Sequence, residues 1–398
     1  MKVVLIRGGH GAKDEGTHRL ARAFSRAGYE VTILEWDREA TLPKVESVDN
    51  YLCHRFRLKA PYGSLTVLLR LPFWELYQCY FLLKLKRKEV TIHACDFDTL
   101  LPALFAKFIK RTKLCYTIFD FYHDFPVNSP WFIKRTIVNV EKFALRFVDC
   151  LFMVNEDMYE EIRGAKVKEV AYIYNCPEDY CGIKELTSRD KVTLPIKIFY
   201  AGSITSIRGL KHMIDAVREV EDVKLIIAGT GTEEDVKAIL DEELLISGKL
   251  EYLGWIPYKQ VIEGDLNADI LFYFVDPTSL NGKYSSPNKL FEAMMCGKPI
   301  IANKGSFMSK IVEEEKCGIT VPFGNVDAIR DAVAKLRDDP ELRQKLGRNG
   351  RNAYDRCYNW ELMQKRLIEA YSKICEHEVM QPPAIISAEQ NGNKEQPK

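Results

Sequence analysis

This sequence lacks paired cysteines, and it lacks an apolar run long enough for a transmembrane helix. The 11 cysteines are scattered along 398 residues without a C-x-x-C pair, so the sequence indicates neither a zinc site nor a disulfide framework. No stretch of 18 consecutive residues is entirely apolar, so no transmembrane helix is predicted. The opening segment MKVVLIRGG has too short an apolar run for a signal peptide. We therefore expect a protein of a reducing, cytoplasmic compartment.

The chain also has little net charge, but its charges are unevenly distributed. The formal net charge is +1, which gives no reason to expect a nucleic-acid partner. Residues 1–150 contain 24 Lys and Arg against 16 Asp and Glu, whereas residues 151–398 contain 33 against 40. This asymmetry predicts that only the first half faces an anionic surface.

One Leu-rich and aromatic stretch stands out within the basic half. It covers residues 61–90 and ends in a basic cluster at Lys84, Lys86, Arg87 and Lys88. A helix with an apolar face, aromatic rings and a basic rim suits the interfacial region of an anionic membrane. The alternative is a core helix with a solvated basic end. The charge excess of the first half favours peripheral contact with the cytoplasmic face of a membrane.

Each half of the chain opens with a buried strand, a glycine turn and a helix. Gly9 and Gly11 follow the first strand, and Gly202 and Ser203 follow the strand that opens the second half. Strands that alternate with helices predict an α/β fold with parallel sheets, whose ligands bind at the carboxyl ends of the strands. A polar, proline-containing and aperiodic stretch between the halves is typical of a linker.

Other strand ends carry residues suited to ligand binding. His123 follows one strand in the segment DFYHDFP, and Gly229 and Gly231 follow another in GTGT. Because ligands bind at this edge of parallel sheets, His123 is a candidate polar group of an active site. The alternative is an ordinary histidine on a surface loop. The glycines allow close approach of the backbone to a ligand.

The stretch from Tyr284 to Asn303 combines a helix start with a buried strand. Ser286 suits the N-cap and Pro287 the first helical position. Lys289 lies in the first turn, where the helix dipole disfavours a cation unless an anion docks there. Glu292 follows on the same face, one turn deeper. We predict a phosphate at the helix start and a carboxylate that holds a ribose; the alternative is a solvated lysine and a surface glutamate.

The motif S-x-x-K-L-F-E-x-M-x-x-G-K-P, which begins at Ser286, resembles the donor-site signature of GT-B glycosyltransferases of the glycosyltransferase 4 type. The resemblance implies a GT-B fold, in which two Rossmann-like, doubly wound parallel-sheet domains face a central cleft. It also implies a UDP- or GDP-sugar donor whose ribose contacts Glu292, and transfer with retention of anomeric configuration. The family usually carries a first Glu eight residues earlier, where this chain has Tyr284.

The resemblance also assigns roles to other residues. Arg208 with Gly209 resembles a Lys-Gly element of the family, and Ser203 stands where many members carry Arg. No acidic pair lies near the predicted phosphate site, so we expect no metal and no cofactor, with cations and N–H groups stabilising the leaving diphosphate. The predicted catalytic residues are His123, Arg208, Lys289 and Glu292; the donor-binding residues are Gly202, Ser203, Gly229, Gly231, Trp255, Ile256, Ser286, Pro287, Asn288 and Leu290; and Gly9, Gly11 and Asp96 lie on the acceptor side.

The predicted organisation follows the two halves. It comprises an acceptor-binding domain at 1–175, a linker at 176–195, a nucleotide-sugar-binding domain at 196–355, a crossover helix at 356–376 that packs back on the first domain, and a disordered tail at 377–398.

Three functions remain open at this point. The first is a retaining, metal-independent glycosyltransferase with a lipid-linked or surface-glycan acceptor. The second is a nucleotide-sugar 2-epimerase of the same architecture, which needs an acid–base set of which only His123 is placed. The third is a catalytically silent nucleotide-sugar-binding subunit, because Tyr284 replaces the first Glu of the family pattern.

Overall fold

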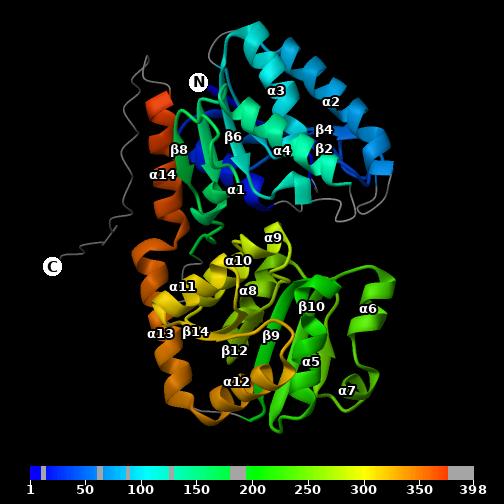
Figure 1. Ribbon diagram of the computed structural model, residues 1–398, viewed down its shortest axis with the longest axis vertical. Helices are drawn as coiled ribbons and strands as arrows, with labels where there is room; N and C mark the ends of the chain where they lie inside the picture. The colour runs from blue at the N-terminus through cyan, green and yellow to red at the C-terminus, as the bar shows by residue number, and fades with distance from the viewer. Residues whose placement is uncertain (10–14, 61–65, 87–89, 125–129, 180–193, 375–398) are drawn as a thin grey trace, which may run out of the picture.

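Two sheets, one in each half of the chain, organise the protein (Figure 1). The computed structural model describes residues 1–9, 15–60, 66–86, 90–124, 130–179 and 194–374. Gly11, most of the predicted linker and the predicted tail at 377–398 lie outside the described residues. The predicted class, two Rossmann-like α/β domains with parallel sheets, is confirmed.

The first sheet has eight strands in the order β3-β4-β2-β1-β5-β6-β7-β8. All neighbours are parallel except β3, which pairs with β4 in the antiparallel sense. The sequence analysis gave no strand for the polar segment that forms the edge strand β3 and its neighbour β4, because neither has a long apolar run. The strands are β1 (Lys2–Arg7), β2 (Glu30–Asp37), β3 (Val45–Val48), β4 (Tyr51–Arg57), β5 (Val90–Cys95), β6 (Lys113–Ile118), β7 (Cys150–Met153) and β8 (Val170–Tyr172).

Helices cover both faces of the first sheet (Figure 1). The helix α1 (Glu15–Arg26) packs against β1 and β2, while α2 (Thr66–Lys84), α3 (Phe97–Lys110) and α4 (Trp131–Leu145) form the other layer. Two short 3₁₀ helices, η2 (Tyr122–Asp124) and η3 (Asp157–Glu160), follow β6 and β7. We find no described helix that is long and apolar enough to cross a membrane.

The second sheet has six parallel strands in the order β11-β10-β9-β12-β13-β14. Its strands are β9 (Ile196–Ser203), β10 (Val223–Thr230), β11 (Leu250–Tyr252), β12 (Ile270–Tyr273), β13 (Ile300–Asn303) and β14 (Gly318–Val321). Its helices are η5 (Ser206–Arg208), α5 (Leu210–Arg218), α6 (Glu233–Ile239), α7 (Glu242–Ile246), α8 (Tyr258–Asn267), α9 (Leu280–Lys283), α10 (Asn288–Met295), α11 (Phe307–Glu315) and α12 (Val326–Asp338).

The last two helices join the domains. Helix α13 (Pro340–Cys357) packs against α10, and α14 (Trp360–Ile374) packs against β8 and α1 of the first domain. Because Asn359 accepts a hydrogen bond from the N–H of Leu362 (3.0 Å), a new helix starts there, and α14 begins a few residues after the predicted start at 356. In Figure 1, α14 runs alongside β8.

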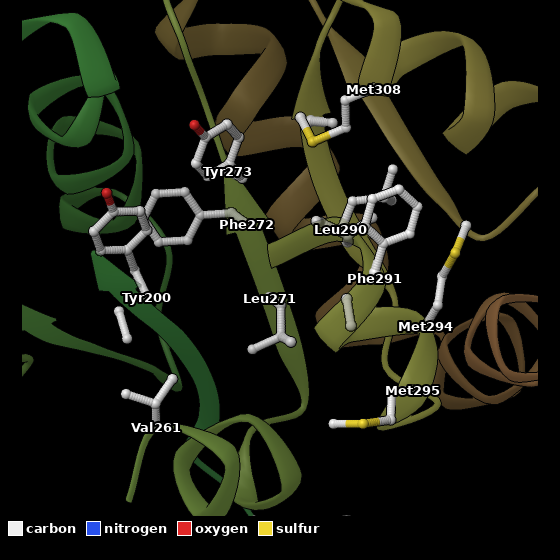
Figure 2. Close-up of a cluster of buried hydrophobic side chains, with 14 of the residues drawn as sticks. Tyr200, Val261, Leu271, Phe272, Tyr273, Leu290, Phe291, Met294, Met295 and Met308 are labelled. Carbon is white, nitrogen blue, oxygen red and sulfur yellow. The ribbon is translucent and has the colours of Figure 1, made fainter. Parts of the chain in front are cut away.

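The buried face of α10 anchors it to the second sheet. Leu290, Phe291, Met294 and Met295 are almost fully buried, and Figure 2 shows them among the side chains of the second core. Burial of such side chains stabilises a fold by roughly 1.5–3 kcal/mol each. The apolar stripe therefore holds α10 in one orientation, with its start at the carboxyl ends of the strands.

Candidate functional site

A cleft lies between the two domains at the carboxyl ends of their strands. Its volume is about 390 Å³, and both domains supply its walls. The chemistry of the lining is polar and mainly cationic, as a binding site for an anion requires. Its charged and hydroxyl-bearing residues include Arg7, Glu15, Arg19 and Asp120 from the first domain and Tyr200, Ser203, Arg208, Tyr273, Ser286 and Lys289 from the second.

The start of α10 forms one wall of this cleft. The helix begins at Asn288, so Pro287 is its N-cap rather than its first helical residue, and no side chain caps it. The hydroxyl of Ser286 is buried and has no hydrogen-bond partner among the described residues. The first N–H groups of a helix lack partners within it. This wall therefore offers unpaired donors and the positive end of a dipole.

Lys289 and Glu292 form an ion pair within the first turns of α10. Glu292 is 1% exposed, and its other carboxylate oxygen accepts a hydrogen bond from the Tyr258 hydroxyl (3.0 Å). Burial by itself lowers the pKa of Lys289, but the carboxylates of Glu292 and Asp265 outweigh it and raise that pKa above its usual value. Lys289 lines the cleft, and Glu292 lies beneath it.

Asp265 of α8 is a buried carboxyl group beneath this ion pair. Neither of its oxygens has a hydrogen-bond partner among the described residues, and the residue is 1% exposed. Burial raises the pKa of Asp265, the charge of Glu292 adds to this effect, and Lys289 opposes it. The cluster therefore holds one ammonium group between two carboxyl groups.

Arg208 lines the same cleft as the α10 start. One of its Nη atoms donates to the Tyr273 hydroxyl, and the guanidinium lies 5.0 Å from the centre of the Tyr273 ring. Beside it, the Tyr200 hydroxyl donates to the carbonyl oxygen of Ser203 (2.9 Å). These contacts hold Arg208 in the cleft together with Gly202 and Ser203.

Arg19, which the sequence analysis did not single out, adds a cation from the first domain. Its residue is 3% exposed, yet no carboxylate pairs with it in the part of the chain that the structure describes. It donates to the carbonyl oxygen of Cys176, approaches Asn288 Oδ1 at 3.5 Å and lies 5.1 Å from the Trp360 ring. The spacing of residues along α1 cannot predict these contacts, because the partners of Arg19 lie more than 150 residues away in the chain.

Several predicted donor-binding residues lie outside the described lining of the cleft. A side chain at Gly229 would place its Cβ 1.7 Å from the Gly202 carbonyl oxygen, so close packing of β10 against β9 requires this glycine. A Cβ at Gly231 would lie 2.1 Å from the Ile204 carbonyl oxygen. Trp255 is 64% exposed on a loop beside Ile256, and Leu290 belongs to the core.

The predicted residues of the first domain also have internal roles. His123 is buried, and its Nδ1 has no partner among the described residues. Burial lowers the pKa of His123, and the carboxylates of Glu161 and Asp124 only partly offset this. Asp96 pairs with Arg7 and accepts a hydrogen bond from the N–H of Phe119 (2.8 Å). His123, Asp96 and Gly9 are not among the described residues that line the cleft.

Tyr284, which replaces the first Glu of the family pattern, connects the two domains. It is 5% exposed, packs in the apolar cluster of the first domain, and donates from its hydroxyl to Glu161 (3.0 Å). Its carbonyl oxygen accepts a hydrogen bond from Asn155 (2.7 Å). Although Tyr284 borders the cleft, its side chain therefore serves the contact between domains.

Asn281 makes a second contact of this kind. Its side chain accepts from the N–H of Phe121 (2.7 Å) and donates to the Phe121 carbonyl oxygen (3.2 Å), as a neighbouring strand would. Its own N–H donates to Asp124 (2.9 Å). We call the contacts of Asn281 and Tyr284 with the first domain the interdomain clasp.

Two family models match successive parts of the chain. The model "Glycosyltransferase Family 4" matches residues 15–177, and the model "Glycosyl transferases group 1" matches residues 185–353. The first match lies in the domain with α1–α4, and the second contains the start of α10 with Lys289 and Glu292.

Known proteins with similar chains are glycosyltransferases. An uncharacterised glycosyltransferase of Methanocaldococcus jannaschii is 24% identical over 77% of this chain and 83% of its own length. The GDP-mannose-dependent monoacylated alpha-(1-6)-phosphatidylinositol monomannoside mannosyltransferase of Corynebacterium glutamicum is 28% identical, over 40% of this chain and 41% of that protein.

A solved structure has the same fold over nearly the whole chain. HepE of Anabaena, solved in complex with UDP and glucose, superposes with a TM-score of 0.69 over 94% of this chain and 99% of its own, at 17% sequence identity. Together with the two matched models, this architecture shows that the chain is an enzyme that belongs to the GT-B glycosyltransferases of the glycosyltransferase 4 type.

Proposed function

We propose that this protein is a retaining, metal-independent glycosyltransferase that moves a sugar from a UDP- or GDP-sugar to a lipid-linked or surface-glycan acceptor. The observation that carries the proposal is the uncapped start of α10, which meets Lys289 and Arg208 in the cleft. A diphosphate at this position accepts hydrogen bonds from free N–H groups and is attracted by two cations. Two similar proteins support these donors. The mannosyltransferase of Corynebacterium glutamicum is named as GDP-mannose-dependent, and HepE of Anabaena was solved in complex with UDP and glucose.

We infer that the Lys289–Glu292 ion pair of α10 links the contacts of the diphosphate to those of the ribose. Lys289 and Tyr258 each donate to one carboxylate oxygen of Glu292. A diphosphate at the helix start provides Lys289 with a second anionic partner, which leaves a Glu292 oxygen to accept from a ribose hydroxyl. The affinity for the diphosphate and the affinity for the ribose are therefore coupled through one lysine.

The transfer step breaks the bond between the sugar and the diphosphate. Negative charge develops on the leaving diphosphate, and the groups that stabilise it must be in place beforehand. Lys289, Arg208 and the α10 N–H groups meet this need from the second domain, and Arg19 meets it from the first. In the family mechanism that we propose for this chain, the leaving phosphate helps to deprotonate the acceptor hydroxyl, and the configuration is retained.

We further propose that the acceptor is held at a membrane, on its cytoplasmic face, with the first domain in peripheral contact with anionic lipid. The excess of Lys and Arg in residues 1–150 supports this placement, because anionic lipid attracts basic segments. The acceptor named for the Corynebacterium relative is a monoacylated phosphatidylinositol mannoside, which is an amphiphile.

A screen of nucleotide sugars tests the donor. A ligand at about 100 times its dissociation constant should stabilise the protein by about 2.7 kcal/mol, which a thermal-shift assay with UDP-, GDP-, ADP- and CMP-sugars will detect. We expect a shift with a UDP- or GDP-sugar. If none of the four classes raises the melting temperature, the proposed donor site is wrong.

The two other functions predict different products from the donor that binds. A 2-epimerase converts the donor itself when no acceptor is added, but His123 is not among the described residues that line the cleft. A silent binding subunit leaves the donor unchanged with every acceptor pool. Nuclear magnetic resonance of the donor, with and without membrane extracts, separates these outcomes from transfer.

A further inference from the structure

Large apolar side chains are exposed on one part of the first domain. Of 22 exposed large apolar residues among those described, 14 lie on the helices α2, α3 and α4. A soluble surface normally scatters such residues, and their concentration marks an interaction site. They are Leu68, Leu69, Phe73, Leu76, Tyr80 and Leu83 on α2, Leu101, Phe105, Phe108 and Ile109 on α3, and Trp131, Phe132, Ile133 and Phe143 on α4.

These residues share one layer of the molecule. Helix α2 packs against α3, α3 packs against α4, and Figure 1 shows the three helices together on the first domain. Leu69 and Trp131 are 74% and 72% exposed, so the face is not closed by the rest of the described chain. We call this layer the α2–α4 face. The prediction from residues 61–90 concerned α2 alone, and the tertiary structure adds α3 and α4.

The charges on the α2–α4 face have one predominant sign. The three helices contain only three acidic residues, of which Asp98 and Glu141 are buried and Glu75 is half-buried. Apart from Lys107, which pairs with Asp149, the described basic residues on these helices and directly after them are Arg70, Lys84, Lys86, Lys110, Arg111, Lys113, Lys134, Arg135, Lys142 and Arg146.

We propose that the α2–α4 face docks on the surface of an anionic lipid bilayer. Aromatic and leucine side chains enter the region between head groups and acyl chains, and the surrounding lysine and arginine residues approach the acidic head groups. The near absence of exposed acidic residues argues for this occupant over a protein partner of mixed charge or a second copy of this chain, whose equally basic face would repel it.

This docking places the cleft close to the bilayer. Helix α4 contacts η2, and Asp124 of η2 accepts a hydrogen bond from the N–H of Asn281 of α9 at the cleft. A head group that projects from the bilayer therefore reaches the cleft along the first domain. This step rests on the proposed function, because only a glycosyltransferase needs a membrane-held hydroxyl group there.

Vesicle sedimentation with paired variants tests the docking. We expect the protein to bind vesicles of phosphatidylcholine with about 30% phosphatidylglycerol at low salt, and to bind at least about tenfold more weakly in ~0.5 M NaCl or with phosphatidylcholine alone. The double variant Leu69→Ser/Trp131→Ser should bind about tenfold more weakly. Ile246→Ser is the matched control, since Ile246 is 81% exposed but lies on the second domain.

A double charge-reversal variant distinguishes electrostatic attraction to anionic lipid from purely apolar binding. Arg135→Glu/Arg146→Glu should lose the preference for phosphatidylglycerol, whereas Lys237→Glu on the second domain should keep it. No binding at low salt, or equal losses in the Ile246→Ser control, would overturn the proposal. The proposal would also be overturned if sedimentation velocity showed that the parent protein is a dimer and that the Leu69→Ser/Trp131→Ser variant is not.

The same proteins distinguish this proposal from the proposed function. A thermal shift with a UDP- or GDP-sugar in the face variants, together with absent vesicle binding in the parent protein, would refute the docking and leave the donor site intact. Vesicle binding by a protein that no nucleotide sugar stabilises would instead refute the donor site and leave the docking intact.

Discussion

The outer surfaces of the two domains differ far more than their folds. Both domains consist of a parallel sheet between helices, but the first exposes 17 large apolar side chains and the second, from residue 196 onward, exposes only 4 among the described residues. The architecture requires each helix to bury one face against its sheet and leaves the opposite face undetermined. The difference therefore reports what surrounds each domain: we expect lipid for the first and water for the second.

In the cleft, unlike on the outer surfaces, the two domains contribute residues to the same site. Lys289 and Arg208 come from the second domain, and Arg19 and the partners of the interdomain clasp come from the first. We expect the second domain to provide the donor site and the first domain to add only Arg19 to it, so other changes in the first domain should affect transfer more than donor affinity. The following predictions test this division of roles.

The largest effect is expected from the ion pair of the second domain. Lys289→Ala and Glu292→Ala should each lower the transfer rate by about 1000-fold or more, because one removes a cation and the other a ribose acceptor from the proposed site. Lys304→Ala, an exposed lysine after β13, is the control. Turnover is compared after circular dichroism has verified folding.

Glu292→Ala also leaves the Lys289 ammonium, whose side chain is 16% exposed, without its ion-pair partner, and loss of one partner of a fully buried pair destabilises a protein by roughly 3–5 kcal/mol. Glu292→Gln avoids this problem in part, because its amide oxygen can accept from Tyr258. Folded Glu292→Gln or Lys289→Ala protein with parental turnover would contradict the proposed site.

Arg19 should give the next largest effect and directly tests the role of the first domain. Because this buried guanidinium has no carboxylate partner among the described residues, Arg19→Gln should weaken binding of UDP or GDP by about 10–100-fold while sparing UMP or GMP. Calorimetric titration measures both. Arg26→Gln, whose guanidinium pairs with Glu178 on the surface, is the control. Equal losses for mono- and diphosphates would assign Arg19 to domain packing.

Acid should destabilise the first domain through His93, which connects β5 to α14. Its ring nitrogens contact the hydroxyls of Tyr371 (2.5 Å) and Thr117 (2.6 Å), and burial lowers the pKa of His93 to about 3. The unfolded pKa is about 6.5, so this contribution is fully present above that pH and is lost as the pH falls towards 3.

The expected loss from this histidine between pH 7 and pH 5 is about 2 kcal/mol in the free energy of unfolding. His93→Gln should be less stable at pH 7 but should lose less between the two values, whereas His212→Gln should behave as the parent does. Urea unfolding at both pH values measures this, and an unchanged pH dependence in His93→Gln would contradict it.

The smallest effect is expected from the interdomain clasp. Asn281→Ala removes the two side-chain hydrogen bonds to the backbone of Phe121 and keeps the N–H bond to Asp124 of η2, and we expect transfer to fall by roughly threefold to tenfold. Donor affinity should stay unchanged, because the clasp provides none of the groups of the proposed donor site. Thr278→Ala, on the exposed loop before α9, is the control. A matching loss of donor affinity would show that the clasp also supports the donor site.

Local patterns predicted much of this molecule. The alternation of buried strands with helices predicted two parallel sheets, and the motif at Ser286 predicted α10, with a start one residue early, and the proximity of Lys289 to Glu292. Residues three apart on a helix are neighbours in any fold, so this pair needed no tertiary information. The polar strands β3 and β4, at and next to the edge of the first sheet, were not predicted because neither carries a continuous apolar run.

The amino-acid sequence by itself determined the two α/β halves and the contacts that lie within one turn of a helix, because spacing along the chain decides them. Only the tertiary structure decided that Arg19 reaches Asn288, that Tyr284 packs into the first domain, and that α2, α3 and α4 form one exposed face. Those contacts join residues far apart in the chain. Their geometry depends on how whole sheets and helices pack, and no local pattern records it.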